Sequence, residues 1–333
     1  MSLSEPALVP HRYTAAISDD NSAFTSRRDA WWRRFAPSCA SPLCPHRGKL
    51  WPSRLRKNSG VLFDSHWFCE PACFRPHLEY RVRNLLSTFL EQKSKAHRLP
   101  LGLLLVEQAA VTHSQLRDAL RLQRASGSGR IGDFFLGIGA ITEHQLTSAL
   151  AQQWGCPIFP LERQHPHPSW SALLPLAILD SALAVPAHSN PDTRTLHIAF
   201  AERPDHTLLY AIEQMLDCRT VACMAPKSAV AQLLDHRRAT NPPETSFDTV
   251  RDPGEITYTI CSYAQELRAA RVAIARVTAH IWVRFYRKDA NRDLLFRILP
   301  DHCSKLTHLP PAKAFSVPAD NRKDGVSDAA LPL

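Results

Sequence analysis

A motif of 24 residues that occurs twice, over residues 100–123 and 130–153, constrains the fold of this chain more than any other feature. The two copies keep one register from end to end, so a shift of 30 residues superposes them. Repetition in a constant register implies that both copies fold into the same supersecondary unit. The positions that are identical in both copies are Gly102/Gly132, Ala110/Ala140, Thr112/Thr142, Gln115/Gln145, Leu116/Leu146, Ala119/Ala149, Leu120/Leu150 and Gln123/Gln153.

Each copy predicts a pair of helices. A short first helix, over residues 101–108 and 133–138, ends in small residues. A capping box of the form Thr-x-x-Gln follows and begins at Thr112 and Thr142. After it, apolar residues recur at i, i+3, i+4 and i+7, which defines one face of a second helix. We therefore expect a tandem helix-pair repeat over residues 98–164.

The doubled motif resembles that of the N-terminal domain of the assembly ATPases of type II secretion and type IV pili, over about residues 98–237. The second copy begins with Arg130-Ile-Gly, and both copies end in Leu-x-x-Ala-Leu-x-x-Gln, as the family motif does. In one branch of that family the doubled motif binds cyclic di-GMP. The resemblance implies that such a ligand would contact Arg98, Leu101, Leu116, Leu120, Gln123, Arg130, Ile131, Leu146, Leu150 and Gln153.

The resemblance also implies a role for each kind of residue. Arg130 would stack its planar guanidinium on a guanine and meet a phosphate, the apolar residues would lie under the ligand, and the glutamines would close the site. The first copy departs from the pattern, because Pro100 stands at the arginine position and Ala109 at the glycine position. Arg98 is the nearest substitute for the missing arginine. A helical packing module without a ligand is the alternative, since kinship of fold does not transfer function.

Two pairs of cysteines near the N-terminus predict a structural zinc site. Cys39 and Cys44 lie in a stretch rich in proline and serine, and Cys69 and Cys73 lie at the start of a helix expected over residues 70–92. A loop pair and a pair at a helix start form a treble-clef-like site, in which four thiolates close a tetrahedron around Zn²⁺. The alternatives are buried cysteines without a metal, or a substitute ligand among His46, His66 and His77.

The rest of the chain completes an expected α+β fold. Strands and helices alternate after the repeat, and a further helix is followed by strands of alternating polarity that form a β-hairpin. The expected segments are a zinc-knuckle-like segment with its helix (1–97), the tandem repeat (98–164), a small α/β unit (165–240), a helix with β-strands (241–305) and a disordered tail (306–333).

An absent motif shapes the functional expectation. No G-x-x-x-x-G-K-[ST] sequence occurs, so this chain lacks the phosphate-binding loop of an ATPase motor. The G-x-G-x-x-G match at residues 127–132 does not follow a strand and carries no meaning as a nucleotide fingerprint. We expect a non-enzymatic adaptor that docks on a secretion or pilus component. The N-terminus lacks a signal-peptide pattern, and with no long apolar run a bacterial cytoplasmic protein is expected.

Two other functions stay open at this point. Nine Lys or Arg residues and one acid, Asp29, lie between residues 27 and 57, and tryptophans lie nearby. A basic patch of this kind suits an anionic partner, so binding of nucleic acid through the zinc-like segment is the main alternative. An inactive remnant that only oligomerises is the third hypothesis.

Overall fold

The computed structural model describes residues 39–45, 60–87, 98–161, 173–240, 246–247, 252–278 and 280–298, and its architecture is α+β as predicted. Most of the basic segment and the predicted tail at 306–333 lie outside the described residues. No helix in the described part of the chain is long and apolar enough to cross a membrane. The elements are β1 (Val61–Phe63), β2 (His66–Phe68), α2 (Pro71–Ser87), α3 (Leu101–Glu107), α4 (His113–Ser126), α5 (Ile131–Gly137), α6 (Glu143–Trp154), α8 (Leu176–Ala182), β3 (Ala184–Asn190), β4 (Thr195–Phe200), α9 (His206–Leu216), β5 (Arg219–Met224), α10 (Lys227–Thr240), β6 (Ser246–Phe247), α11 (Pro253–Glu266), β7 (Arg271–Val277), β8 (His280–Tyr286) and β9 (Arg292–Arg297).

The doubled motif folds into two helix pairs, α3–α4 and α5–α6, and the helices of each pair pack on helices of the other pair. Both predicted capping boxes are present. The backbone N–H of Gln115 donates to the Thr112 hydroxyl, and the backbone N–H of Thr112 donates to the Gln115 side chain. Thr142 and Gln145 repeat this arrangement in the second copy. Helix α4 packs on α5 and helix α3 on α6, so each copy covers the other. Their shared core centres on Leu105 and Phe135. One copy alone would leave its apolar face uncovered.

The first helix of each copy ends at a residue in the left-handed conformation, and only the second copy has glycine there. Gly139 has φ 66°, whereas Ala109 has φ 52° at the matching position. Because a Cβ costs energy in this region, we expect Gly139→Ala to lower the free energy of unfolding by about 1 kcal/mol and Ala109→Gly to raise it by up to about 1 kcal/mol. A Cβ on Gly139 would meet no atom within 4 Å, so the comparison isolates backbone strain. Urea unfolding of both variants measures it, and equal effects of the same sign would contradict the explanation.

The small α/β unit begins where α6 ends. Strands β3 and β4 pair antiparallel, and β4 pairs parallel with β5 through the crossover helix α9. The chain after α6 joins this sheet through a bridge between Ile158 and Met224. Helix α9 is capped by Asp205, whose carboxylate accepts from the N–H groups of Thr207 and Leu208.

The second sheet is larger than the predicted hairpin and combines strands from two segments far apart in the sequence. Its strand order is β2-β1-β7-β8-β9-β6, and β1 pairs parallel with β7. The segments predicted separately, the cysteine-rich region and the helix with strands, therefore share one sheet and one apolar core. Parallel pairing between strands so far apart in sequence leaves no local signal, because each strand reads as an isolated apolar run.

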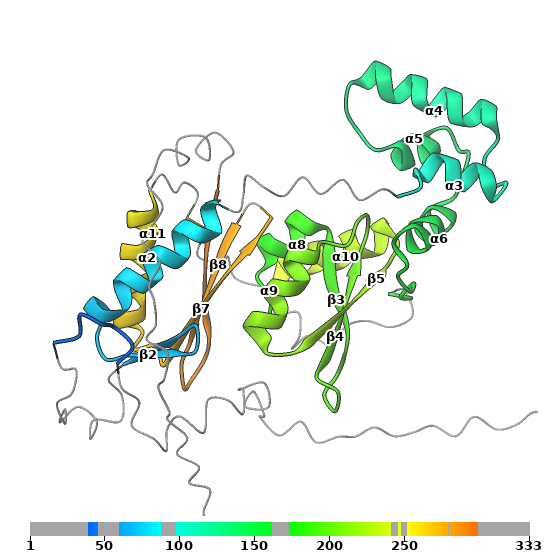
Figure 1. Cartoon of the computed structure of the whole chain (residues 1–333). Coiled ribbons are helices and arrows are strands. Elements are labelled where there is room, and N and C mark those ends of the chain that lie inside the picture. The colour runs from blue at the N-terminus through cyan, green and yellow to red at the C-terminus, as the bar shows by residue number, and fades with distance from the viewer. Residues whose placement is uncertain are drawn as a thin grey trace, which may run out of the picture.

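Helices cover both faces of this second sheet. Figure 1 shows β7 and β8 between α2 and α11 on one side and α9 on the other, with the doubled motif beyond the three-stranded sheet. Strand β8 is accordingly buried on both faces: Ile281, Val283 and Phe285 join the core with α2 and α11, while Trp282 joins the core of the α/β unit. Helix α9 is thus shared by the two sheets.

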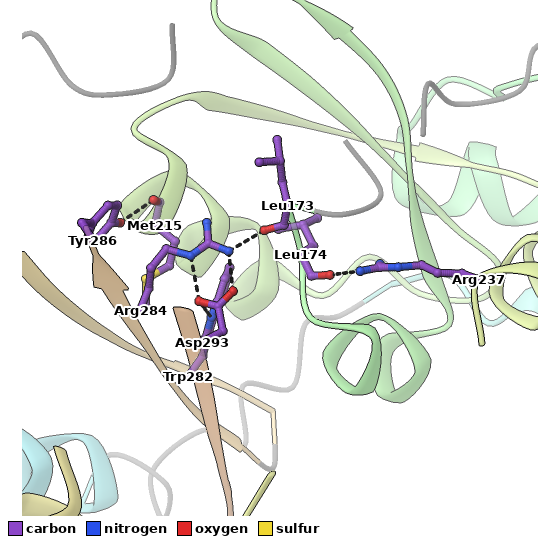
Figure 2. A network of polar contacts seen from close by, with 8 residues as sticks. All are labelled: Leu173, Leu174, Met215, Arg237, Trp282, Arg284, Tyr286 and Asp293. Carbon is purple, nitrogen blue, oxygen red and sulfur yellow. Dashed lines mark hydrogen bonds and ion pairs between the residues drawn. The ribbon is translucent and has the colours of Figure 1, made fainter. Parts of the chain in front are cut away.

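A polar network fixes the α/β unit to strands β8 and β9 (Figure 2). The Arg284 guanidinium is 2% exposed and donates to both carboxylate oxygens of Asp293, at 2.8 and 2.7 Å, and to the Leu173 carbonyl. Burial alone would lower the pKa of Arg284, but Asp293 outweighs it and the pKa is raised. Tyr286 donates its hydroxyl to the Met215 carbonyl on α9. The network therefore joins elements far apart in the sequence through a buried charge pair.

Candidate functional sites

The glutamine that ends each copy of the doubled motif forms a hydrogen bond to the backbone just before the other copy. Gln123 Nε2 donates to the Gly129 carbonyl at 2.9 Å, and Gln153 Nε2 donates to the Leu99 carbonyl at 2.7 Å. Each glutamine ends one copy, and each carbonyl directly precedes the first residue of the other. The arrangement is reciprocal, and it places the starts of the two copies in equivalent surroundings.

The predicted apolar residues of the site are all half-buried, but the structure brings only some of them together. Leu116 and Leu146 lie over Gly102 and Gly132, where an added Cβ would come within 2.7 and 3.0 Å of their methyl groups. Leu101 reaches from the first copy toward Gly132 of the second. Those that pack against the core of the doubled motif are Leu101, Leu116, Ile131 and Leu146, whereas Leu150 packs against the core of the α/β unit. The glycines shared by the two copies, Gly102 and Gly132, are therefore needed for close helix packing.

The two predicted arginines are next in sequence to the carbonyls that accept from the glutamines. Arg98 precedes Leu99, and Arg130 follows Gly129. The Arg98 guanidinium lies over the Trp154 ring, 3.5 Å from its centroid. Arg130 is 61% exposed, and its Nη1 lies 2.7 Å from Oε2 of Glu202. Arg98 thus has an aromatic partner, Trp154, which the sequence did not predict.

The Arg130–Glu202 ion pair continues into charged contacts that sequence reasoning missed. Lys227 Nζ lies 3.3 Å from Glu202 Oε1 and 3.3 Å from Asp133 Oδ1. Glu143 accepts from both the backbone N–H and the hydroxyl of Ser228, at 2.7 and 2.6 Å. Burial tends to lower the pKa of Lys227, but Asp133 and Glu202 outweigh it and the pKa is raised. The second copy therefore contacts the start of α10 through charged groups.

The four predicted cysteines form a compact cluster. The Sγ atoms of Cys39, Cys44, Cys69 and Cys73 all lie within 4.8 Å of one another, with 3.5 Å between Cys44 and Cys69 and 3.7 Å between Cys69 and Cys73. In a tetrahedron with metal–sulfur bonds of ~2.3 Å the sulfurs lie about 3.8 Å apart. The cluster therefore has the dimensions of a four-thiolate metal site. Among the described residues His66 and His77 are not part of it: His66 contacts the Asp64 carbonyl, and the His77 ring packs on Phe63.

Local structure explains how the cluster forms. The β1–β2 hairpin delivers Cys69 to the start of α2, and Cys73 lies in the first turn of that helix. The loop with Cys39 and Cys44 is attached to β2 by a hydrogen bond from Ala40 N to the Trp67 carbonyl. Burial raises the pKa of the Cys69 thiol and raises that of Cys73 to about 12. Without a metal these thiols stay protonated, so a metal ion must displace protons to bind.

The chain is 35% identical over 88 residues to the type IV pilus assembly ATPase PilB of Myxococcus xanthus (strain DK1622). The chain is a relative of assembly ATPases over part of its length. The predicted resemblance is thereby confirmed, and the match spans 26% of this chain and 15% of PilB. No family model matches the chain.

Two solved structures are also similar to part of this chain. A structure of MshE with cdg (cyclic di-GMP) is 31% identical, covers 42% of this chain and 99% of its own, and has a TM-score of 0.36. The N-terminal domain of XpsE is 18% identical, covers 39% of this chain and 89% of its own, and has a TM-score of 0.26.

Proposed function

We propose that this chain is a non-catalytic regulatory adaptor that binds cyclic di-GMP on its doubled motif and docks on a component of secretion or pilus machinery. The observation that supports it best is the reciprocal geometry of the two copies, in which each closing glutamine holds the carbonyl beside an arginine of the site. The ligand in the MshE structure suggests the class of ligand, and the relationship to PilB suggests the kind of machinery.

The chemistry of the site suits a cyclic dinucleotide. Such a ligand carries two guanines and two phosphates, and a reciprocal pair of half-sites matches that symmetry. A guanidinium that packs over an indole can offer its other face to a planar base, so Trp154 would hold Arg98 in place to stack. Arg98 would then supply the function that Pro100 removes from the first copy, while Arg130 would serve the second.

The non-catalytic part of the proposal rests on the absent phosphate-binding loop. An ATPase motor needs backbone N–H groups and a lysine around the phosphates and a Ser or Thr for Mg²⁺. This sequence contains no such motif. Signalling would therefore act through a change in docking instead of a chemical step.

Calorimetric titration with cyclic di-GMP tests the proposed ligand. We expect one dinucleotide per chain for the wild type, and a loss of affinity of about 10-fold or more for Arg130→Met and Arg98→Met, since hydrogen bonds to charged groups contribute about 1.5–3 kcal/mol. Arg121→Met is the control, because Arg121 on α4 is 76% exposed and pairs only locally with Asp118. No heat from the wild type at high micromolar ligand would remove cyclic di-GMP from the proposal.

We also propose that the cysteine cluster holds a structural Zn²⁺. Four thiolates in tetrahedral surroundings suit zinc, and four protein ligands leave no position open for catalysis. Cys39, Cys44, Cys69 and Cys73 would be the ligands. The ion would join the β1–β2 hairpin, the start of α2 and the preceding loop.

A further inference from the structure

The two copies of the motif differ in the residues that face the α/β unit. Arg130, Asp133 and Glu143 all contact that unit, and the matching positions of the first copy hold Pro100, Leu103 and His113. The charged residues of the second copy therefore make contacts with the α/β unit that the residues at the matching positions of the first copy cannot make in the same way. Their partners are Glu202 in the loop after β4 and Lys227 and Ser228 at the start of α10.

Two kinds of contact hold the doubled motif to the rest of the protein. In the last turn of α6 and in the segment after it, Ala151 and Leu161 join the apolar core of the α/β unit, which fixes that end of the doubled motif. At the start of α5 the contact is ionic and half-exposed: Arg130 is 61% exposed, Lys227 47% and Asp133 46%, while Glu202 is 18% exposed. Half-exposed ion pairs contribute little stability and respond to competing ions. The contact between the start of α5 and the α/β unit is therefore the one that a competing anion can break.

We propose that Glu202 is an internal competitor for the anionic ligand at Arg130, and that Lys227 is a second cation of that site. Ligand binding would then replace the Arg130–Glu202 ion pair and loosen the contact between the second copy and α10. This inference rests on the proposed function. Glu202 is positioned for the role because its two oxygens bind the two cations separately, Oε2 on Arg130 and Oε1 on Lys227, as two oxygens of one phosphate would.

The competition predicts opposite effects of two substitutions on ligand affinity. Glu202→Gln removes the internal anion and keeps the shape, so cyclic di-GMP should bind about two- to five-fold more tightly, the range expected for a half-exposed ion pair. Lys227→Met removes a cation and should weaken binding by a similar factor. Asp118→Asn is the matched control, because Asp118 is 56% exposed and pairs with Arg121 on its own helix, and the affinity of this variant should equal that of the wild type.

Hydrogen exchange gives a second readout that needs no substitution. The Ser228 amide donates to Glu143 across the contact, so its exchange rate reports whether the second copy lies on α10. By reciprocity, a ligand that gains from an open contact must also open it. Saturating cyclic di-GMP should therefore speed exchange of the wild-type Ser228 amide in the full chain.

The outcomes separate this inference from the proposed function. Tighter binding by Glu202→Gln together with faster exchange at Ser228 supports the competition. Equal affinity of wild type and Glu202→Gln, or slower exchange with ligand, overturns this inference and leaves the ligand in place. Absence of heat from both proteins overturns the proposed ligand and this inference with it.

Discussion

Asp293→Ala is expected to lower the free energy of unfolding by about 3–5 kcal/mol, because it leaves a buried guanidinium without its counter-charge. Arg284 is 2% exposed, and both of its bonds to a carboxylate go to Asp293. The same substitution also removes the acceptor of the Trp282 indole N–H, which donates to Asp293 at 2.9 Å. Two buried donors would lose their partner at the junction between the sheet and the α/β unit.

Urea unfolding of the full chain measures this loss. Asp289→Ala is the matched control, since Asp289 is 81% exposed in its pair with Arg287 and should cost at most about 1 kcal/mol. The double variant Arg284→Met, Asp293→Leu should recover much of the stability, because a buried ion pair can be replaced by apolar residues. A loss below 1 kcal/mol for Asp293→Ala would show that the pair does not hold the junction.

Removal of the metal is expected to have the second large effect. If Zn²⁺ joins the four cysteines, a chelator should lower stability by about 3–5 kcal/mol, or about 10 °C in the melting temperature. The free energy of metal binding is folding free energy for the hairpin and the loop beside α2. Because the metal must displace protons from thiols whose pKa burial has raised, its affinity should fall as the pH falls.

Metal analysis of the purified protein, combined with thermal unfolding, checks this expectation. Cys73→Ser should lose the metal and the stability together. Cys218→Ser is the control, because Cys218 is buried in the core of the α/β unit away from the cluster, and the metal should remain. A metal content near zero with no response to chelator would contradict the zinc site.

The elements that could be predicted from the sequence are those with a local signal. The capping boxes at Thr112 and Thr142 and the register of the repeat specify the helix pairs of the doubled motif. The spacing of the four cysteines likewise predicted a cluster that the structure forms. In each case the deciding interactions lie within a few residues or within a motif of fixed spacing.

The features that sequence reasoning missed depend on contacts between distant segments. The parallel pairing of β1 with β7 and the sharing of α9 by two sheets have no local pattern. The same holds for Glu202 and Lys227, which lie far from Arg130 in the sequence. One signal was available: the second copy holds Arg130, Asp133 and Glu143 where the first holds uncharged residues or histidine, and such asymmetry in a repeat indicates a partner for one copy only.

The most direct test of the doubled motif as the ligand site is a hydrogen-exchange footprint of the full chain with saturating cyclic di-GMP. We predict slower exchange at the starts of both copies, residues 98–104 and 128–134, which contain the two arginines and the carbonyls that accept from the closing glutamines. In Arg130→Met the same footprint should need about 10-fold more ligand or higher, in line with the expected loss of affinity. Protection confined to residues 60–87, or no change at either start, would contradict the assignment of the site.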